Sequence, residues 1–348
     1  MKRRTFLQSL GVVSAASAVG IGSFPAIGNQ KAKPGPVNKR DAVLNLIHSN
    51  EKQDYCPAGF FIHFPEEDHF GPTAVDKHLE YFRFTGLDFL KIQYERRFPL
   101  IEKLQKPSDW ADVPLLKKDF YEGQLKVIEG IVKKGKKEAL VIPTVYSPLS
   151  FAGHFTGYKH HIDHLNEDPD AVKKGLEIIT ESTLIFVKEC IKLGVDGFFQ
   201  ATQGGEAHRF KHEGIFENYI KLYDLIVAQE ADKHCECNIL HIHAGEGLYN
   251  DYSAFVDYPG HMINCGLQLN GSRTTPKEIS DLLGRPFMGG LERAGIIYSG
   301  SQSEIENEVK RTIDKAPEKF VLGATCTLPG DTDWKNIKIA ADTAHNYV

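Results

Sequence analysis

Short apolar runs alternate with longer amphipathic segments along the chain after residue 40. The short runs are bounded by glycine, proline or charged residues, which is typical of buried parallel strands. The segments between them carry apolar residues at helical spacing. Predicted strands cover residues 59–64, 87–94, 139–146, 195–200, 238–243, 261–265, 286–290 and 319–323. Predicted helices cover residues 41–49, 73–84, 118–134, 169–193, 215–232, 251–257, 276–283, 303–315 and 333–346.

Start and stop signals support several of these helices. Asp168 and Thr275 each precede a proline, so both are expected to cap a helix whose first residue is that proline. Gly86 lies two residues after the end of one predicted helix and Gly194 directly after another, positions where glycine is favoured because it adopts the left-handed conformation easily.

The alternation of strands and helices predicts an α/β fold, a single (β/α)8 TIM barrel over residues 40–348. A doubly wound open sheet is the alternative. It would need a glycine-rich phosphate loop after the first strand, and residues 61–65 (FIHFP) do not provide one. Residues 147–167 show no clear element. We expect them to form an exposed loop on the catalytic face, a candidate lid.

The first 30 residues have the pattern of a targeting segment. Lys2, Arg3 and Arg4 precede Thr5-Phe6-Leu7, and a small, uncharged, apolar run covers residues 10–27. This pattern predicts a twin-arginine signal peptide over residues 1–30 and a linker over residues 31–39, and hence an exported, periplasmic enzyme. An uncleaved anchor is the alternative. No later stretch is apolar and long enough to predict a membrane span in the mature chain.

Composition narrows the classes of partner. The net charge of −5 and pI of about 6.3, with no basic stripe, argue against nucleic acid and leave a small molecule as the expected substrate. The spacing of the six cysteines suggests no disulfide framework. Cys235 and Cys237 precede the strand over 238–243, so they are expected on the face opposite the active site, as structural thiols. The oligomeric state is open.

Active residues of such barrels lie where the strands end. His241 and His243 share one face of their strand, because residues two apart in a strand point the same way, and neutral imidazole is a good zinc ligand. Polar residues follow the other strands as well. The candidates are His63, Tyr94, Glu95, Tyr146, Gln203, Glu206, His241, His243, Glu246, Gln268, Glu292, Arg293 and Cys326.

Four stretches of the chain resemble the uroporphyrinogen decarboxylase superfamily. They are residues 73–95, 168–200, 240–247 and 286–334, the last with Gly289-Gly290-Leu291-Glu292, Gly300-Ser301-Gln302-Ser303-Glu304-Ile305 and Thr325-Cys326-Thr327-Leu328-Pro329. The resemblance implies the (β/α)8 barrel already predicted, and an enzyme.

Two branches of that superfamily differ in their chemistry. True decarboxylases use no metal, and they carry an arginine-rich segment after strand 1 and an aspartate after strand 2. This chain has Glu66-Glu67-Asp68 and Tyr94-Glu95 at the matching places. The zinc methyltransferase branch carries His-x-Cys after strand 5 and Cys after strand 8. The matching residues here are His241, His243 and Cys326, with imidazole in place of one thiolate.

The resemblance therefore implies zinc held by His241, His243 and Cys326, which is a chemically sensible ligand set. Glu206 or Glu246 is expected as fourth ligand or general base. Tyr94 and Glu95 complete the expected catalytic set, and a further group is expected to bind substrate: His63, Tyr146, Gln203, Gln268, Glu292 and Arg293.

The expected reaction is methyl or one-carbon transfer, or cleavage of a small ether-like substrate, with a corrinoid protein as a possible partner. Fewer thiolates leave the zinc more electrophilic, which suits water or alkoxide. The alternative is a metal-free decarboxylase of a porphyrinogen-like or smaller acid, with Arg96, Arg97 and Arg293 binding its carboxylates. A non-catalytic binding protein is a third class, disfavoured by the many polar strand ends.

Overall fold

The computed structural model describes residues 37–49 and 54–347. The predicted signal peptide and all but the end of the predicted linker lie outside the described residues. From Asn38 onward the chain forms one compact unit. Within the described part, no helix has both the length and the apolar character needed to cross a membrane.

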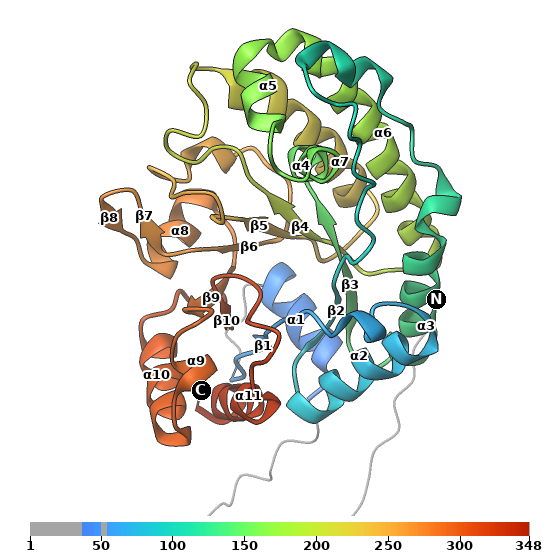
Figure 1. Ribbon diagram of the computed structural model, residues 1–348. Helices are drawn as coiled ribbons and strands as arrows, with labels where there is room; N and C mark the ends of the chain where they lie inside the picture. The colour runs from blue at the N-terminus through green and yellow to red at the C-terminus, as the bar shows by residue number, and fades with distance from the viewer. Residues whose placement is uncertain (1–36, 50–53, 348) are drawn as a thin grey trace, which may run out of the picture. The chain divides into compact units, whose positions relative to one another are not determined.

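Eight parallel strands form a nearly closed barrel, which confirms the predicted fold (Figure 1). They hydrogen-bond in the order β1-β10-β9-β6-β5-β4-β3-β2, so each strand from β2 onward pairs with the next barrel strand along the chain, and the last, β10, pairs with β1. The barrel strands are β1 (Ala58–Gly59), β2 (Phe89–Ile92), β3 (Leu140–Tyr146), β4 (Phe199–Thr202), β5 (Ile239–Ile242), β6 (Met262–Cys265), β9 (Phe287–Leu291) and β10 (Phe320–Ala324). A separate antiparallel hairpin joins β7 (Gln268–Leu269) to β8 (Ser272–Arg273).

Helices connect the strands and cover the outside of the barrel (Figure 1). The α-helices are α1 (Lys39–His48), α2 (Gly71–Thr85), α3 (Glu122–Gly135), α4 (Pro148–Thr156), α5 (His161–Glu167), α6 (Pro169–Leu193), α7 (Leu222–Asp232), α8 (Pro276–Leu283), α9 (Ile296–Ser299), α10 (Gln302–Asp314) and α11 (Trp334–Tyr347). Shorter turns are η1 (Glu66–Asp68), η2 (Pro107–Asp112), η3 (Lys118–Tyr121), the π-helical η4 (Phe216–Lys221) and η5 (Ser253–Phe255).

The predicted helix ends are confirmed. The side chains of Asp168 and Thr275 accept hydrogen bonds from backbone N–H groups in the first turns of α6 and α8. Gly86 and Gly194 end α2 and α6 with φ of 76° and 86°.

The barrel interior is apolar at the end where the strands begin. Strand residues such as Phe89, Ile142, Ile239 and Val321 form one buried cluster, and Val43 of α1 packs into the same cluster. Because α1 closes this end with apolar side chains, polar chemistry is confined to the other end, where the strands finish. Cys237 belongs to the apolar cluster, in accord with its predicted structural role.

Asp88 joins the two barrel strands that share no ladder, β1 and β2. Its carboxylate accepts hydrogen bonds from the Ala58 N–H at 2.8 Å and from the Tyr55 hydroxyl at 2.6 Å. His345 of α11 lies 2.8 Å from the same carboxylate, and the Asp88 N–H donates to the Ala58 carbonyl at 3.0 Å. A fully buried side chain thus closes the seam of the barrel.

Residues 147–167 were wrongly predicted to be an exposed loop. They form α4 and α5, and Phe151, Phe155, His161 and His164 are buried. The His164 ring accepts a hydrogen bond from the Trp110 indole N–H at 3.0 Å. Ser147 caps α4, whose apolar residues follow helical spacing. The glycines within and after α4 hid this pattern in the sequence.

Two other predicted elements are shorter in the structure. The first strand covers only Ala58–Gly59, because the next carbonyls bond outside the sheet: Phe60 accepts from the Tyr81 hydroxyl and Phe61 from the Leu328 N–H. The helix predicted over 251–257 is reduced to the single turn η5.

Candidate metal and substrate site

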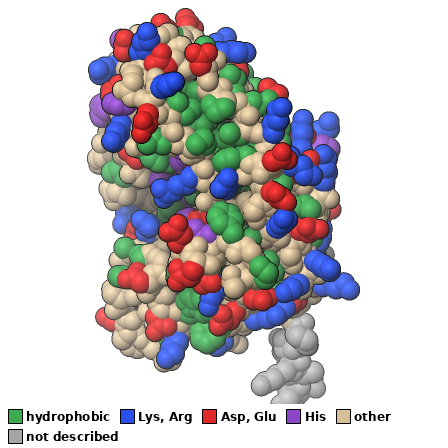
Figure 2. Space-filling model, turned by 45° about the vertical axis from the view of Figure 1, so that its right-hand side comes forward, with side chains coloured by type: hydrophobic (Ala, Val, Ile, Leu, Met, Phe, Trp, Pro, Cys, Tyr) green, Lys and Arg blue, Asp and Glu red, His purple; other side chains and the backbone are tan. Residues whose placement is uncertain are grey.

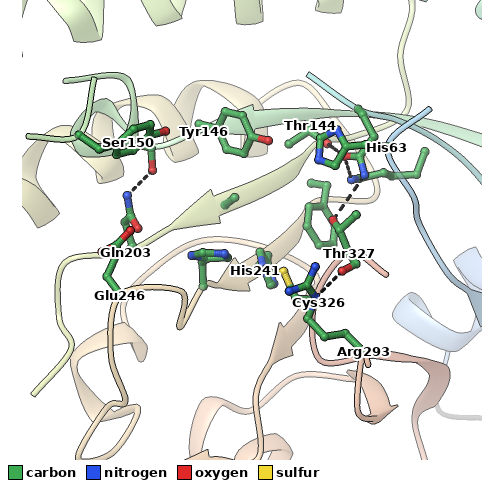
Figure 3. A pocket seen from close by; sticks show the side chains of 16 residues that line it. His63, Thr144, Tyr146, Ser150, Gln203, His241, Glu246, Arg293, Cys326 and Thr327 are labelled. Carbon is green, nitrogen blue, oxygen red and sulfur yellow. Dashed lines mark hydrogen bonds between the residues drawn. The ribbon is translucent and has the colours of Figure 1, made fainter. Parts of the chain in front are cut away.

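A cavity of about 310 Å³ lies at the ends of the barrel strands (Figure 3). Side chains from β2 to β5 and from the loops after β1, β9 and β10 line it. The lining residues are His63, Lys91, Gln93, Thr144, Tyr146, Ser150, Tyr158, Phe199, Ala201, Gln203, His241, His243, Glu246, Arg293, Cys326 and Thr327. Charges of both signs are interspersed over the face of the molecule seen in Figure 2.

Strand alternation explains why polar groups meet here. Every second residue of a barrel strand points inward, so Phe89 lies in the apolar layer, and Lys91 and Gln93 follow above it. On β5, Ile239 lies in the apolar layer, with His241 and His243 above. The cavity therefore has an apolar base and polar walls.

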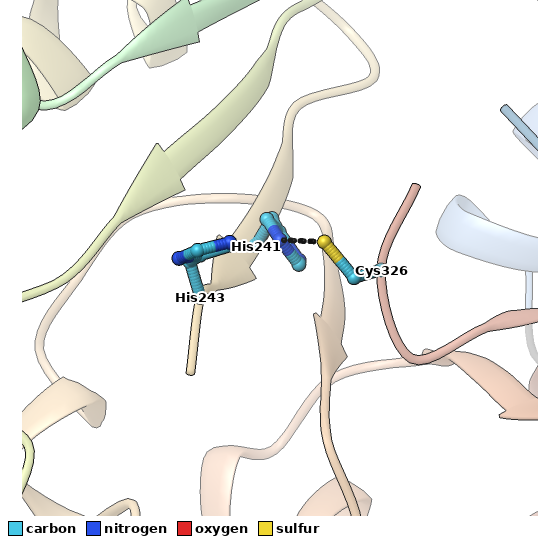
Figure 4. Close-up of side chains that lie close together, drawn as sticks. All are labelled: His241, His243 and Cys326. Carbon is cyan, nitrogen blue, oxygen red and sulfur yellow. Dashed lines mark hydrogen bonds between the residues drawn. The ribbon is translucent and has the colours of Figure 1, made fainter. Parts of the chain in front are cut away.

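His241, His243 and Cys326 converge on one wall (Figure 4). One potential ligand atom from each lies within 4.8 Å of those of the other two. The Cys326 Sγ is 3.5 Å from the His241 Nε2. His241 is buried and its ring stacks on Phe199, with centroids 4.8 Å apart. The three side chains predicted as metal ligands are brought together by β5 and by the loop after β10.

The electrostatics of this cluster suit ligand chemistry. Burial, and secondarily the charge of Lys91, lower the pKa of His241 to about 4, so its imidazole is neutral at pH 7. Burial opposes ionisation of the Cys326 thiol, but a hydrogen bond and positive charge from His243 outweigh it, so the pKa of Cys326 is lowered. A neutral imidazole and a thiol biased toward thiolate are the forms that bind zinc.

The spacing of the ligand atoms supports the same interpretation. Two ligands of one tetrahedral zinc ion, with bonds of about 2.3 Å to sulfur and about 2.0 Å to nitrogen, lie roughly 3.5 Å apart. The Cys326 Sγ and the His241 Nε2 have that separation. The residues present therefore fit a metal ion of the zinc type.

A second pair of ionisable groups lies on the β1 and β2 side of the cavity. The Nδ1 of His63 is 2.9 Å from Glu95 Oε1, and His69 lies 3.7 Å from the other oxygen of Glu95. The Glu95 N–H donates to the Gln124 side chain at 2.9 Å. Burial opposes ionisation of Glu95, but the two histidines outweigh it, so its pKa is lowered. A carboxylate fixed in this way orients the His63 ring, as in a base–orienter pair.

Eight of the predicted site residues line the cavity: His63, Tyr146, Gln203, His241, His243, Glu246, Arg293 and Cys326. The Gln203 amide donates to the Ser150 hydroxyl at 2.8 Å, and the Arg293 Nε donates to the Thr327 carbonyl at 2.6 Å (Figure 3). Glu246 is half-exposed and pairs with Arg209 at 3.2 Å.

The other five predicted residues do not line the cavity. Tyr94 follows Gln93 and so faces the opposite way, where its ring packs against Phe186 of α6. Glu95 acts on the cavity only through His63. Glu206 turns back to accept the Gly204 N–H at 2.7 Å.

Gln268 and Glu292 are placed by the β7–β8 hairpin. The Gln268 amide donates to the Ser272 carbonyl at 2.9 Å, and Glu292 is exposed and lies 3.4 Å from Arg273 of β8. Neither glutamate proposed as fourth ligand, Glu206 or Glu246, joins the metal-type cluster among the residues described.

Sequence reasoning missed several lining residues, of which Lys91 is the most informative. A lysine inside the apolar run FLKI is itself a signal, because an inward-facing charge in a barrel strand has no structural need. Tyr158 was missed because its segment was predicted to be a loop. It lines the cavity with φ of 63°, a conformation uncommon for a residue other than glycine.

Comparison with known proteins identifies relatives of the fold. A family model described as uroporphyrinogen decarboxylase (URO-D) matches residues 89–347. A solved methyltransferase from Methanosarcina mazei is similar in fold, with a TM-score of 0.71 and 15% identity over 89% of this chain and 98% of that one.

A putative vitamin-B12 independent methionine synthase from Listeria monocytogenes is also similar. Its TM-score is 0.54, with 12% identity over 85% of this chain and 99% of that one. No curated protein sequence matches this chain.

Proposed function

This chain belongs to the uroporphyrinogen decarboxylase (URO-D) family, and we propose that it is a metal-dependent enzyme that transfers a methyl or other one-carbon group, or cleaves a related small ether. The observation that carries the proposal is the convergence of His241, His243 and Cys326 in one cavity. The fold shared with the Methanosarcina mazei methyltransferase supports it.

The metal proposed is zinc, held by His241, His243 and Cys326. When bound, zinc supplies a Lewis acid that lowers the pKa of a coordinated thiol, alcohol or water. Two imidazoles and one thiolate supply three of the four ligands that zinc usually takes, so water or substrate would be the fourth. Glu206 and Glu246 were both predicted as fourth ligand or general base. Of the two, Glu246 lines the half-exposed edge of the cavity and Glu206 does not line it, so Glu246 is the better candidate.

Proton transfer is assigned to the His63 and Glu95 pair. Glu95 holds the Nδ1 of His63, which leaves Nε2 as the ring atom free to exchange a proton with a group in the cavity. Gln203, fixed by Ser150, and Arg293, fixed by Thr327, have set positions from which to orient a substrate.

The size and charge of the site favour a small substrate over a porphyrinogen. A cavity of about 310 Å³ is near the lower end of the roughly 300–1,000 Å³ typical of small-molecule pockets. Of the three arginines expected to bind a polycarboxylate, only Arg293 lines the cavity, and Arg96 donates to the Phe120 carbonyl instead. The acidic turn η1 follows the first strand.

We further propose that the protein is exported, from the twin-arginine pattern over residues 1–30. A corrinoid protein is the proposed partner if the one-carbon unit is a methyl group.

The test is methyl transfer from methylcobalamin to a panel of small thiols and alcohols, followed by the loss of the methylcobalamin absorption spectrum. Zinc-loaded protein should turn over, whereas Cys326→Ala and His243→Ala should lose activity by about 100-fold or more, as loss of a metal-site residue does. Cys265→Ala and His212→Ala, a buried cysteine and an exposed histidine outside the cavity, serve as controls. Activity that persists after chelation and in Cys326→Ala would contradict the proposal, and CO2 release from small acids by chelated protein would establish the decarboxylase alternative.

A further inference from the structure

Lys91 is a buried cation inside the cavity. Only 9% of the surface of Lys91 is exposed. Its ammonium lies between two aromatic rings, 4.7 Å from the ring centroid of Phe61 and 4.6 Å from that of Phe199. The ammonium donates to the Gln93 side-chain oxygen, and Lys91 itself lines the cavity. The two aromatic faces offset part of the cost of burying this positive charge.

The ammonium of Lys91 has more N–H donors than it uses. It carries three N–H donors, and Gln93 is its one hydrogen-bond partner among the residues that the structure describes. Within the same residues no carboxylate forms an ion pair with it. The acidic groups that act on its charge are the Cys326 thiol and, to a lesser extent, Glu95, which is already bonded to His63. Burial of such a charge is costly unless it is paired.

The remaining charges of the cavity add to this imbalance. Arg293 also lines it and forms no ion pair with a described carboxylate; its Nε donates to a backbone carbonyl. Glu246 is the one carboxylate among the lining residues, and it is paired with Arg209. The two lining cations without an ion pair, Lys91 and Arg293, therefore face one acidic group that is not already paired, the Cys326 thiol, and a bound metal ion would engage that thiol.

We propose that Lys91 forms an anion-binding subsite and that the substrate is a small organic anion, whose charged group is held by Lys91 while its reacting end faces His241, His243 and Cys326. The second half of this statement rests on the proposed function. The subsite itself does not, because Lys91 is not one of the metal-type ligands. Burial also lowers the pKa of Lys91 to about 7, and a bound anion would restore its charge.

Matched ligands test the subsite without a known substrate. Calorimetric titration of the chelated, metal-free full chain with propanoate, propane-1-sulfonate and propyl phosphate measures the dissociation constant of each head group. Propanamide, which has the shape of propanoate without its charge, is the ligand control. Chelation removes direct binding to metal, so the affinity measured reports on the protein side chains.

The variants are Lys91→Met, which keeps the length and apolar packing of the side chain, and Lys173→Met, which changes an exposed lysine of α6. Loss of one charge-assisted hydrogen bond corresponds to about 10- to 100-fold weaker binding. We expect at least one anion to bind the wild type and Lys173→Met equally, and Lys91→Met about 10- to 100-fold more weakly. Lys91→Gln, which keeps hydrogen bonding but not charge, should resemble Lys91→Met, and far-ultraviolet circular dichroism checks that each variant is folded.

The outcomes separate this inference from the proposed function. If no anion binds the wild type, if propanamide binds as tightly as propanoate, or if Lys91→Met keeps full affinity, the subsite does not exist, whatever the zinc content. If anions require Lys91 but the protein takes up no zinc, the subsite stands and the metal-dependent function fails. The head group that binds most tightly identifies the class of anion.

Discussion

The Sγ of Cys326 lies 3.5 Å from the Nε2 of His241, although 85 residues separate them in the chain. His241 lies on β5 and Cys326 in the loop after β10, and these strands are not adjacent, because β6 and β9 lie between them. They meet because both strand ends open toward the barrel axis. The site therefore depends on closure of the barrel, and closure depends on the seam between β1 and β2.

Substitution of Asp88 by Ala should lower the free energy of unfolding by about 3–5 kcal/mol, because it leaves the buried Ala58 N–H and the half-buried Tyr55 and His345 side chains without their shared acceptor. Chemical denaturation measures the change. Asp76→Ala, which removes an exposed ion pair with Lys134, is the matched control and should cost less than about 1 kcal/mol. Equal effects of the two substitutions would show that Asp88 does not hold the seam.

Asp224 should make the protein less stable as pH rises. Burial raises its pKa to about 7 from an ordinary value of 3.8, even though the hydroxyls of Thr202 and Tyr258 donate to it. Between these two pH values the folded state binds the proton and the unfolded state does not, so the contribution is full below about pH 4 and is lost by about pH 7. Three pKa units correspond to roughly 4 kcal/mol.

The comparison that isolates this effect is wild type against Asp224→Asn, because other titrating groups are common to both. The stability of the wild type relative to the variant should fall between pH 4 and 7 and stay flat above pH 8. Parallel stability curves for the two proteins would contradict the assignment.

Replacement of Lys91 by Met should stabilise the metal-free protein by about 1–4 kcal/mol at pH 7, as the removal of a buried charge often does. Burial lowers the pKa of Lys91 from 10.5 to about 7, so the unfolded state binds the proton more readily between these pH values. The advantage of the variant should therefore shrink as pH rises from 7 toward 10. Lys173→Met should leave stability within about 0.5 kcal/mol.

The sequence was sufficient for the barrel and for the metal-type cluster. Strand period two placed His241 and His243 on one face, and the resemblance to the zinc methyltransferase branch added Cys326 as their partner. The sequence-based prediction failed for side chains whose role depends on which residues they contact in the fold. Tyr94 has the polarity of a site residue but faces α6, and Glu206 bonds to its own loop. Lys91 was missed because an apolar run hides its one inward charge, and α4 because its glycines resemble a loop.

The metal content of the purified full chain tests the central claim most directly. After dialysis against zinc and then buffer, the wild type, Cys265→Ala and His212→Ala should each retain about one zinc per chain, as a three-ligand protein site does. By elemental analysis, the variants His241→Ala, His243→Ala and Cys326→Ala should each have lost nearly all of the zinc. The double variants should lose no more, because a site missing one ligand already fails to hold the ion. A wild type that retains no metal, or a Cys326→Ala variant that retains as much zinc as the wild type, would contradict the account.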